Sequence, residues 1–184
     1  SSEEKLRELV KRIKRRVEEI IRRLEESVER DRDEVRRSKE RLEALVEEIR
    51  RRVDDIEKRI DDERLIRTLR EIVRRAEEVV RRAVEEDRKI SDENEDVVRK
   101  VVKRLEKILR EIEKVVKEVA DRLRSEKAVR EVEEELRDME RKLEKVAEEV
   151  TRRSKEVTEK LRESSDRVEK ELRRIIEELE RVAK

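Results

Sequence analysis

Hydrophobic residues recur along this chain with the period of an α-helix. A first stripe runs from Leu6 to Ile60 in 15 steps over 54 residues, which is 3.6 residues per step. The stripe returns to the same phase every 18 residues, and similar stripes run over 65–123 and 129–182. A strict heptad repeat would average about 3.5 residues per step and impose a left-handed supercoil. The pattern therefore predicts long, nearly straight helices with little superhelical twist.

The stripe loses its phase at two places, where helices are expected to end. The acidic segment 61–64 follows Ile60, and its aspartates suit the N-cap of a second helix. The segment 124–127 follows Leu123, and Ser125 can cap a third helix.

Short turns make neighbouring helices antiparallel. The sequence predicts an all-α fold in a single domain, 1–184: a straight, up-down-up antiparallel three-helix bundle. Its helices, each about 60 residues long, are expected near 2–61, 63–124 and 126–184.

The most polar stretch of the expected second helix, residues 87–96, could instead be a loop. However, the stripe passes through this stretch in phase at Asp87, Ile90 and Asn94. Residues that keep the helical phase stay on one helix face. We therefore predict uninterrupted helix over 87–96.

Polar residues interrupt the stripes, or lie beside them, near the middle of each helix. They are Asp31, Ser38, Asp87, Ser91, Asn94, Ser154, Thr158 and Ser164. In an antiparallel hairpin, two residues at the same level are equally far from the centre of the turn. The pairs Asp31–Asn94 and Ser38–Asp87 both centre on position 62.5, inside the first predicted turn. The polar residues of the first two helices are therefore expected to meet at two neighbouring levels.

The third helix is expected to supply further members of these levels. Three pairs centre within one residue of Ser125, in the second turn: Asn94–Ser154, Ser91–Thr158 and Asp87–Ser164. One level should then hold Asp31, Asn94 and Ser154, and the other Ser38, Asp87 and either Ser164 or Ser165.

Such groups are costly to bury without partners, by about 1–3 kcal/mol each and more for a carboxylate. Their predicted proximity indicates a buried hydrogen-bond network. The network would fix the helix register against the shifted packings that an all-aliphatic repeat permits. An arginine, Arg88 or Arg153, could balance a buried aspartate. The alternative interpretation is that the polar residues are partly exposed surface residues at the edges of a slim bundle.

The composition lacks the residue types on which most protein chemistry depends. The chain has no Gly, Pro, Cys, His, Phe, Tyr or Trp. The common general base, the thiolate nucleophile and the imidazole metal ligand are therefore missing, and phosphate loops and nucleophile elbows need Gly. Asp31 and Asp87 are expected about 10 Å apart along the axis, too far to share one ion. We expect no catalytic site, no cofactor and no metal.

Charge and hydropathy argue against several classes of partner. Charged residues make up 60% of the chain, but the net charge is only +1, which favours neither nucleic acid nor anionic membrane. Basic clusters are followed by acidic residues and lack aromatic residues for base stacking, so we expect no nucleic-acid binding. No apolar run exceeds three residues, so neither a transmembrane helix nor a signal-peptide core is expected. The localisation stays open.

The second helix has the widest hydrophobic face. It has 24 hydrophobic residues, against 18 in each of the other two helices. This face is covered either by both neighbouring helices or by another chain. We expect no required partner and favour a monomer, with a homo-oligomer through the second helix as the alternative.

With these features, the chain resembles de novo designed helical bundles, in particular parametric three-helix bundles with buried hydrogen-bond networks. The resemblance covers the whole chain and lies in general features, not in a motif: a Glu/Lys/Arg surface, a Leu/Ile/Val core, equal helix lengths and polar residues at mid-helix. It implies a structural scaffold without a natural biochemical activity. An interaction module, either an oligomeric building block or a caged helical switch, is the alternative. The nearest natural architecture is the spectrin-type rod or spacer repeat, whose core Trp is absent here.

Overall fold

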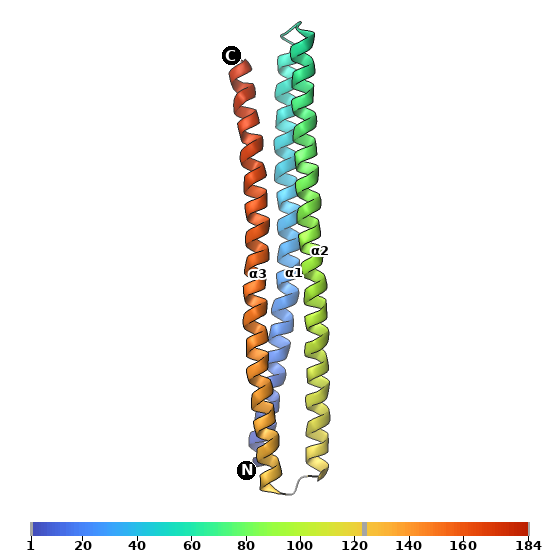
Figure 1. The fold of residues 1–184 in the computed structure, drawn as a ribbon, viewed down its shortest axis with the longest axis vertical. Coiled ribbons are helices and arrows are strands. Elements are labelled where there is room, and N and C mark those ends of the chain that lie inside the picture. The colour runs from blue at the N-terminus through green and yellow to red at the C-terminus, as the bar shows by residue number, and fades with distance from the viewer. Residues whose placement is uncertain (1, 123–124, 184) are drawn as a thin grey trace. The chain divides into compact units, whose positions relative to one another are not determined.

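A computed structural model describes residues 2–122 and 125–183 of the chain. It has three helices: α1 spans Ser2–Glu57, α2 spans Glu63–Arg122 and α3 spans Glu126–Ala183 (Figure 1). No strand occurs among the residues described, and the predicted all-α three-helix bundle is confirmed. Residues 87–96 are helical throughout, as predicted.

Both predicted N-caps are present. The backbone N–H groups of Arg64 and Leu65 donate to Asp62 Oδ1 over 3.0 and 3.4 Å, which satisfies two free donors at the start of α2. The Ala128 N–H donates to Ser125 Oγ over 3.4 Å at the start of α3. Because the chain contains neither Gly nor Pro, no residue between the caps strongly disfavours helix.

The first helix is shorter than predicted, since α1 ends at Glu57 and not at residue 61. The Arg59 N–H donates to the Ile56 carbonyl over 3.0 Å, an i→i−3 bond that closes the helix with a tight turn. The aspartates that follow would oppose the negative end of the helix dipole, and Asp62 is already engaged as the cap of α2. The predicted ends of α2 and α3 at residues 124 and 184 lie outside the described residues.

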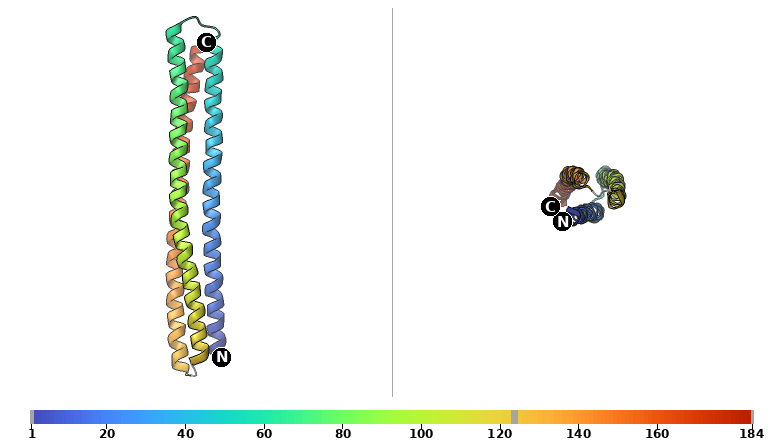
Figure 2. Two further views of the ribbon diagram at one scale, coloured as in Figure 1. Left: turned by 90° about the vertical axis from the view of Figure 1, so that its right-hand side faces the viewer. Right: turned by 90° about the horizontal axis from the view of Figure 1, so that it is seen from below.

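The chain divides into two compact units, each containing part of every helix. The first unit comprises Ser1–Glu29 and Asn94–Glu156, and the second comprises Arg30–Glu93 and Val157–Lys184. Within each unit the three helix segments lie side by side, with α2 antiparallel to α1 and α3 (Figure 1). In the end-on view of Figure 2, the segments of the first unit, nearest the viewer, stand at the corners of a triangle.

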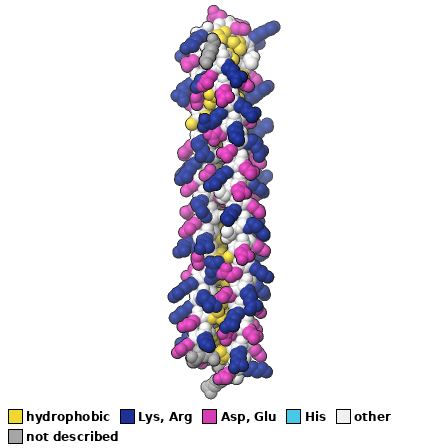
Figure 3. All heavy atoms as spheres, turned by 90° about the vertical axis from the view of Figure 1, so that its left-hand side faces the viewer, with side chains coloured by type: hydrophobic (Ala, Val, Ile, Leu, Met, Phe, Trp, Pro, Cys, Tyr) yellow, Lys and Arg dark blue, Asp and Glu magenta, His cyan; other side chains and the backbone are white. Residues whose placement is uncertain are grey.

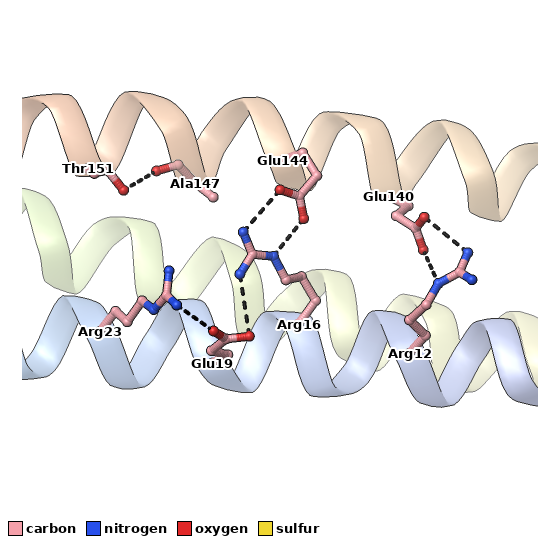
Figure 4. Close-up of polar contacts among 8 residues, drawn as sticks. All are labelled: Arg12, Arg16, Glu19, Arg23, Glu140, Glu144, Ala147 and Thr151. Carbon is pink, nitrogen blue, oxygen red and sulfur yellow. Dashed lines mark hydrogen bonds and ion pairs between the residues drawn. The ribbon is translucent and has the colours of Figure 1, made fainter.

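Ion pairs define how α1 and α3 are aligned in the first unit. Arg16 forms a bidentate pair with Glu144, with distances of 2.6 and 3.0 Å, and Arg12 forms a similar pair with Glu140 (Figure 4). Hydrogen bonding to Arg16 lowers the pKa of the Glu144 carboxyl. Both pairs join residues 128 positions apart, as expected for parallel helices at a constant offset.

The alignment of α1 with its neighbours in the second unit is equally regular. Arg52 contacts Glu180 at 2.9 Å, and these residues are also 128 positions apart. Arg50 pairs with Glu77 at 2.8 Å and Glu57 with Arg70 at 3.1 Å, and in both pairs the residue numbers total 127. A constant total is the mark of antiparallel helices in register.

Each unit has its own hydrophobic core. In the first unit Ile13, Val17 and Ile112 are completely buried, and in the second Leu42 and Leu172 are. On the face drawn in Figure 3, basic and acidic side chains are interspersed, and hydrophobic side chains appear only in narrow strips between them. The core therefore faces inward within each unit, and the charged residues of the sequence face water.

Candidate functional site

The second unit contains a pair of buried serines. Ser38 of α1 donates a hydrogen bond of 2.8 Å to Ser165 of α3, and the two residues are 3% and 2% exposed. Nη2 of Arg41 lies 3.5 Å from the same Ser165 hydroxyl oxygen. Of the two serines that the sequence left open as partners at the level of Ser38, Ser165 is the one that binds it.

A buried carboxylate lies seven residues before Ser38 on α1. Thr158 of α3 donates to Asp31 Oδ1 over 3.2 Å, and Asp31 is 2% exposed. Burial raises the pKa of the Asp31 carboxyl, and the hydrogen bond from Thr158 and the charge of Arg30 oppose that rise. The predicted pairing of Thr158 with Ser91 at one level of α2 and α3 stays a prediction. Ser91 is itself buried.

Asp87 of α2 is the second buried carboxylate of this unit, and it is also 2% exposed. Burial raises its pKa to about 6; a hydrogen bond from the Ser164 side chain lowers the pKa and the charge of Glu86 raises it. This bond supports the predicted pairing of Asp87 with Ser164. The other carboxyl oxygen, Oδ1, is buried and has no hydrogen-bond partner among the residues described.

The first unit contains a cluster of polar side chains that carry no charge. The hydroxyls of Ser27 on α1 and Ser154 on α3 lie 2.5 Å apart, and either can donate. Asn94 of α2 is 4% exposed. Ser27, Asn94 and Ser154 line a cavity of about 20 Å³, with Arg153 also on its wall. A cavity of this size has room for about one water molecule.

Three hydrogen-bonded pairs of polar side chains connect α1 to α3, and all three have the same separation in sequence. Ser27–Ser154, Asp31–Thr158 and Ser38–Ser165 each join residues 127 positions apart. The sequence placed Ser38 at one level with Ser164 or Ser165. It did not predict the other two pairs, because level matching across a turn applies only to antiparallel neighbours, whereas α1 and α3 are parallel. Asp31 and Asn94 belong to different units, and their predicted meeting stays a prediction.

Ser27 is a buried polar residue that was not predicted. The 18-residue phase contained a signal for it, since Leu9, Ser27 and Leu45 are successive residues on one line. Ser27 is 5% exposed. Ser27 therefore occupies a core position, as Asp31 does.

Burial decides between the two interpretations of the predicted polar residues. Those of α1 and α2 are all buried: Asp31, Ser38, Asp87, Ser91 and Asn94. Those of α3 are half-buried: Ser154, Thr158 and Ser164. The alternative, that these are partly exposed residues at the edge of the bundle, is wrong for α1 and α2. Arg88 and Arg153, the predicted counter-charges, are both exposed.

No cluster of three or more acidic residues in the described part of the chain could hold a metal ion. None of the helices, as far as they are described, has a segment long and apolar enough to cross a membrane. No protein-family model, curated protein or solved structure matches the chain.

Proposed function

We propose that this chain is a structural scaffold in which buried polar pairs fix the register of the helices. The observation that supports it is the common separation of 127 residues in the Ser27–Ser154, Asp31–Thr158 and Ser38–Ser165 pairs. The proposal assigns the chain no catalytic activity and no cofactor. The chain also has the surface, core and helix lengths of designed bundles, and we propose that it is one.

The physical basis is the different cost of misalignment for aliphatic and polar residues. If α3 moved by seven residues along α1, most Leu, Ile and Val side chains would meet equivalent partners. Ser27 would then face Ala147, and Ser165 would face Leu45. Each hydroxyl buried without a partner costs about 1–3 kcal/mol. The polar pairs therefore penalise a shift that the aliphatic stripe alone would tolerate.

The test replaces all three polar pairs with apolar side chains: Asp31→Val and Thr158→Val, with alanine in place of Ser27, Ser154, Ser38 and Ser165. We expect the melting temperature to be retained or raised, because no buried carboxylate remains in these pairs. We also expect shifted registers to appear. Since the chain has no cysteine, register can be measured by introduced cysteines and a short thiol crosslinker. Arg52→Cys with Glu180→Cys reports the native register, and Arg52→Cys with Arg173→Cys reports a seven-residue shift.

In the otherwise unchanged chain, only the 52/180 pair should crosslink. In the apolar variant, the 52/173 pair should crosslink as well. If the apolar variant crosslinks only at 52/180, the polar pairs do not set the register and the proposal is wrong.

The hydrophobic face of α2 favours an interaction module as a second candidate. Among residues whose side chains are described, α2 has 14 half-buried and 7 buried hydrophobic residues, whereas α1 has 3 half-buried and 13 buried. The neighbouring helices in each unit therefore cover the hydrophobic residues of α2 less completely than they cover those of α1. A second copy of the chain could cover the remainder.

Light scattering at two protein concentrations separates the candidates. A monomeric scaffold should give a mass near 22.6 kDa at both concentrations. A building block that associates through α2 should give a larger mass that increases with concentration. Replacing the half-buried Val73 and Val102 by Lys should then restore the monomer mass.

A further inference from the structure

The buried polar residues of the two units differ in one respect: only those of the second unit can ionise. In the first unit they are Ser27 and Asn94, and in the second they include Asp31 and Asp87. We infer that the Asp87 carboxyl is a proton-binding site that makes the second unit more stable in mild acid than at neutral pH. This goes beyond the scaffold role, because it holds whether or not the polar pairs fix the register.

The geometry around Asp87 favours the protonated form. Its Oδ1 atom is buried and accepts no hydrogen bond from the described residues, while Ser164 bonds to the same side chain. An ionised carboxylate needs several donors when it is buried. A protonated one needs fewer, since one of its oxygens carries a hydrogen.

Among the residues described, no cation on the surrounding helices neutralises Asp87. On α2 the charge that acts on Asp87 is that of Glu86, which has the same sign, and the adjacent Arg88 is exposed. On α1 the guanidinium of Arg41 contacts Ser165 at 3.5 Å and Glu34 at 3.6 Å.

On α3 the groups at this level are the hydroxyls of Ser164 and Ser165, and the adjacent charged residues, Glu163 and Asp166, are exposed and acidic. Within the described part of the chain, no ion pair includes Asp87. A proton is therefore the available counter-charge.

The direction in which stability changes with pH follows from the pKa of Asp87 in the folded and in the unfolded chain. Burial raises the pKa of Asp87 from an ordinary value of 3.8 to about 6 in the folded protein. Below pH 3.8 the group is protonated in both states and has no effect on folding. As the pH rises toward 6, the unfolded chain releases its proton first, so stability is lost and the unfolding constant increases by about a hundredfold in total. Asp31, whose pKa is also raised, adds to the effect with the same sign.

Hydrogen exchange measured at pH 4.5 and pH 7.5 and corrected for the intrinsic exchange rate tests this in each unit separately. Slow amides of the second unit near Asp87, such as those of Val84 and Arg88, should be about twentyfold more protected at pH 4.5. Slow amides of the first unit, such as that of Leu105, should not gain this protection. Asp87→Asn, which resembles the protonated acid in size, should greatly reduce the difference in protection between the two pH values. Asp92→Asn, at an exposed position of the same helix, is the matched control and should behave like the unchanged chain.

A carbon-13 NMR titration of the Asp87 carboxyl gives a direct readout that does not depend on unfolding. We expect its midpoint near pH 6. Ser164→Ala should move this midpoint to higher pH, because the hydrogen bond to the ionised form is lost. The inference is overturned if Asp87 titrates at the ordinary value of an aspartate. It is also overturned if Asp87→Asn does not reduce the acid-dependent gain in protection.

Discussion

Insertion of one alanine after Arg37 is expected to unfold the second unit. Each added residue turns the rest of α1 by about 100°, so Leu42, Ile49 and Ile56 would rotate out of the core in which they are now buried. Fully burying such a side chain stabilises a fold by about 1.5–3 kcal/mol. The sum over this part of α1 is comparable to the whole stability of an ordinary domain, about 5–15 kcal/mol. Hydrogen exchange should show the loss of slow amides over the second unit, and circular dichroism a lower melting temperature.

The matched control inserts one glycine after Arg59, in the turn between α1 and α2. A longer loop costs only a few tenths of a kcal/mol in closure entropy, at about this length. This variant should therefore keep the slow amides of the second unit. If the alanine variant keeps them too, α1 absorbs the extra residue as a local bulge and its phase does not determine the packing.

Truncation of Leu42 to alanine is expected to lower the free energy of unfolding by about 2–5 kcal/mol. Leu42 is 0% exposed and belongs to the core of the second unit, one helical turn after Ser38. The loss combines the transfer free energy of the removed atoms with the cost of the cavity, because helices that also hold buried polar pairs cannot collapse freely onto it. Urea unfolding followed by circular dichroism measures the change.

Val182 offers a control at the other extreme, since its side chain is 50% exposed near the end of α3. Val182→Ala should change the unfolding free energy by less than about 0.5 kcal/mol. A Leu42→Ala effect no larger than that of Val182→Ala would show that the core of the second unit is loosely packed. In that case the stability of the chain would have to come from elsewhere.

Local signals predicted most of the secondary structure. The Asp62 and Ser125 caps and the uninterrupted helix over 87–96 all depend on residues within a few positions of each other. The end of α1 was less predictable. Ile60 keeps the phase of the stripe, but its contribution competes with the unfavourable charge of the aspartates at the C-terminal end of the helix. Periodicity alone does not weigh these two effects.

The polar centre was predicted in part. Burial of Asp31, Ser38, Asp87, Ser91 and Asn94 could be anticipated, because they occupy or adjoin positions of the aliphatic stripe. Among the residues of α1, only Ser38 had its partner on α3 narrowed down, to Ser164 or Ser165. Ser38 binds Ser165 and Asp31 binds Thr158, both on the parallel helix α3, and no turn connects α1 directly to α3. The offset between two helices without a direct connection is set by side-chain packing along their whole contact.

The order of the helices, their caps and their inward faces were thus encoded in the sequence itself, because helical period and turn position are properties of neighbouring residues. The offset of 127 residues between α1 and α3 was decided only by the tertiary structure, as was the lack of a donor to Asp87 Oδ1 among the described residues. The physical reason is that both depend on the distance between atoms of different helices. Only the packing of complete side chains against one another determines that distance.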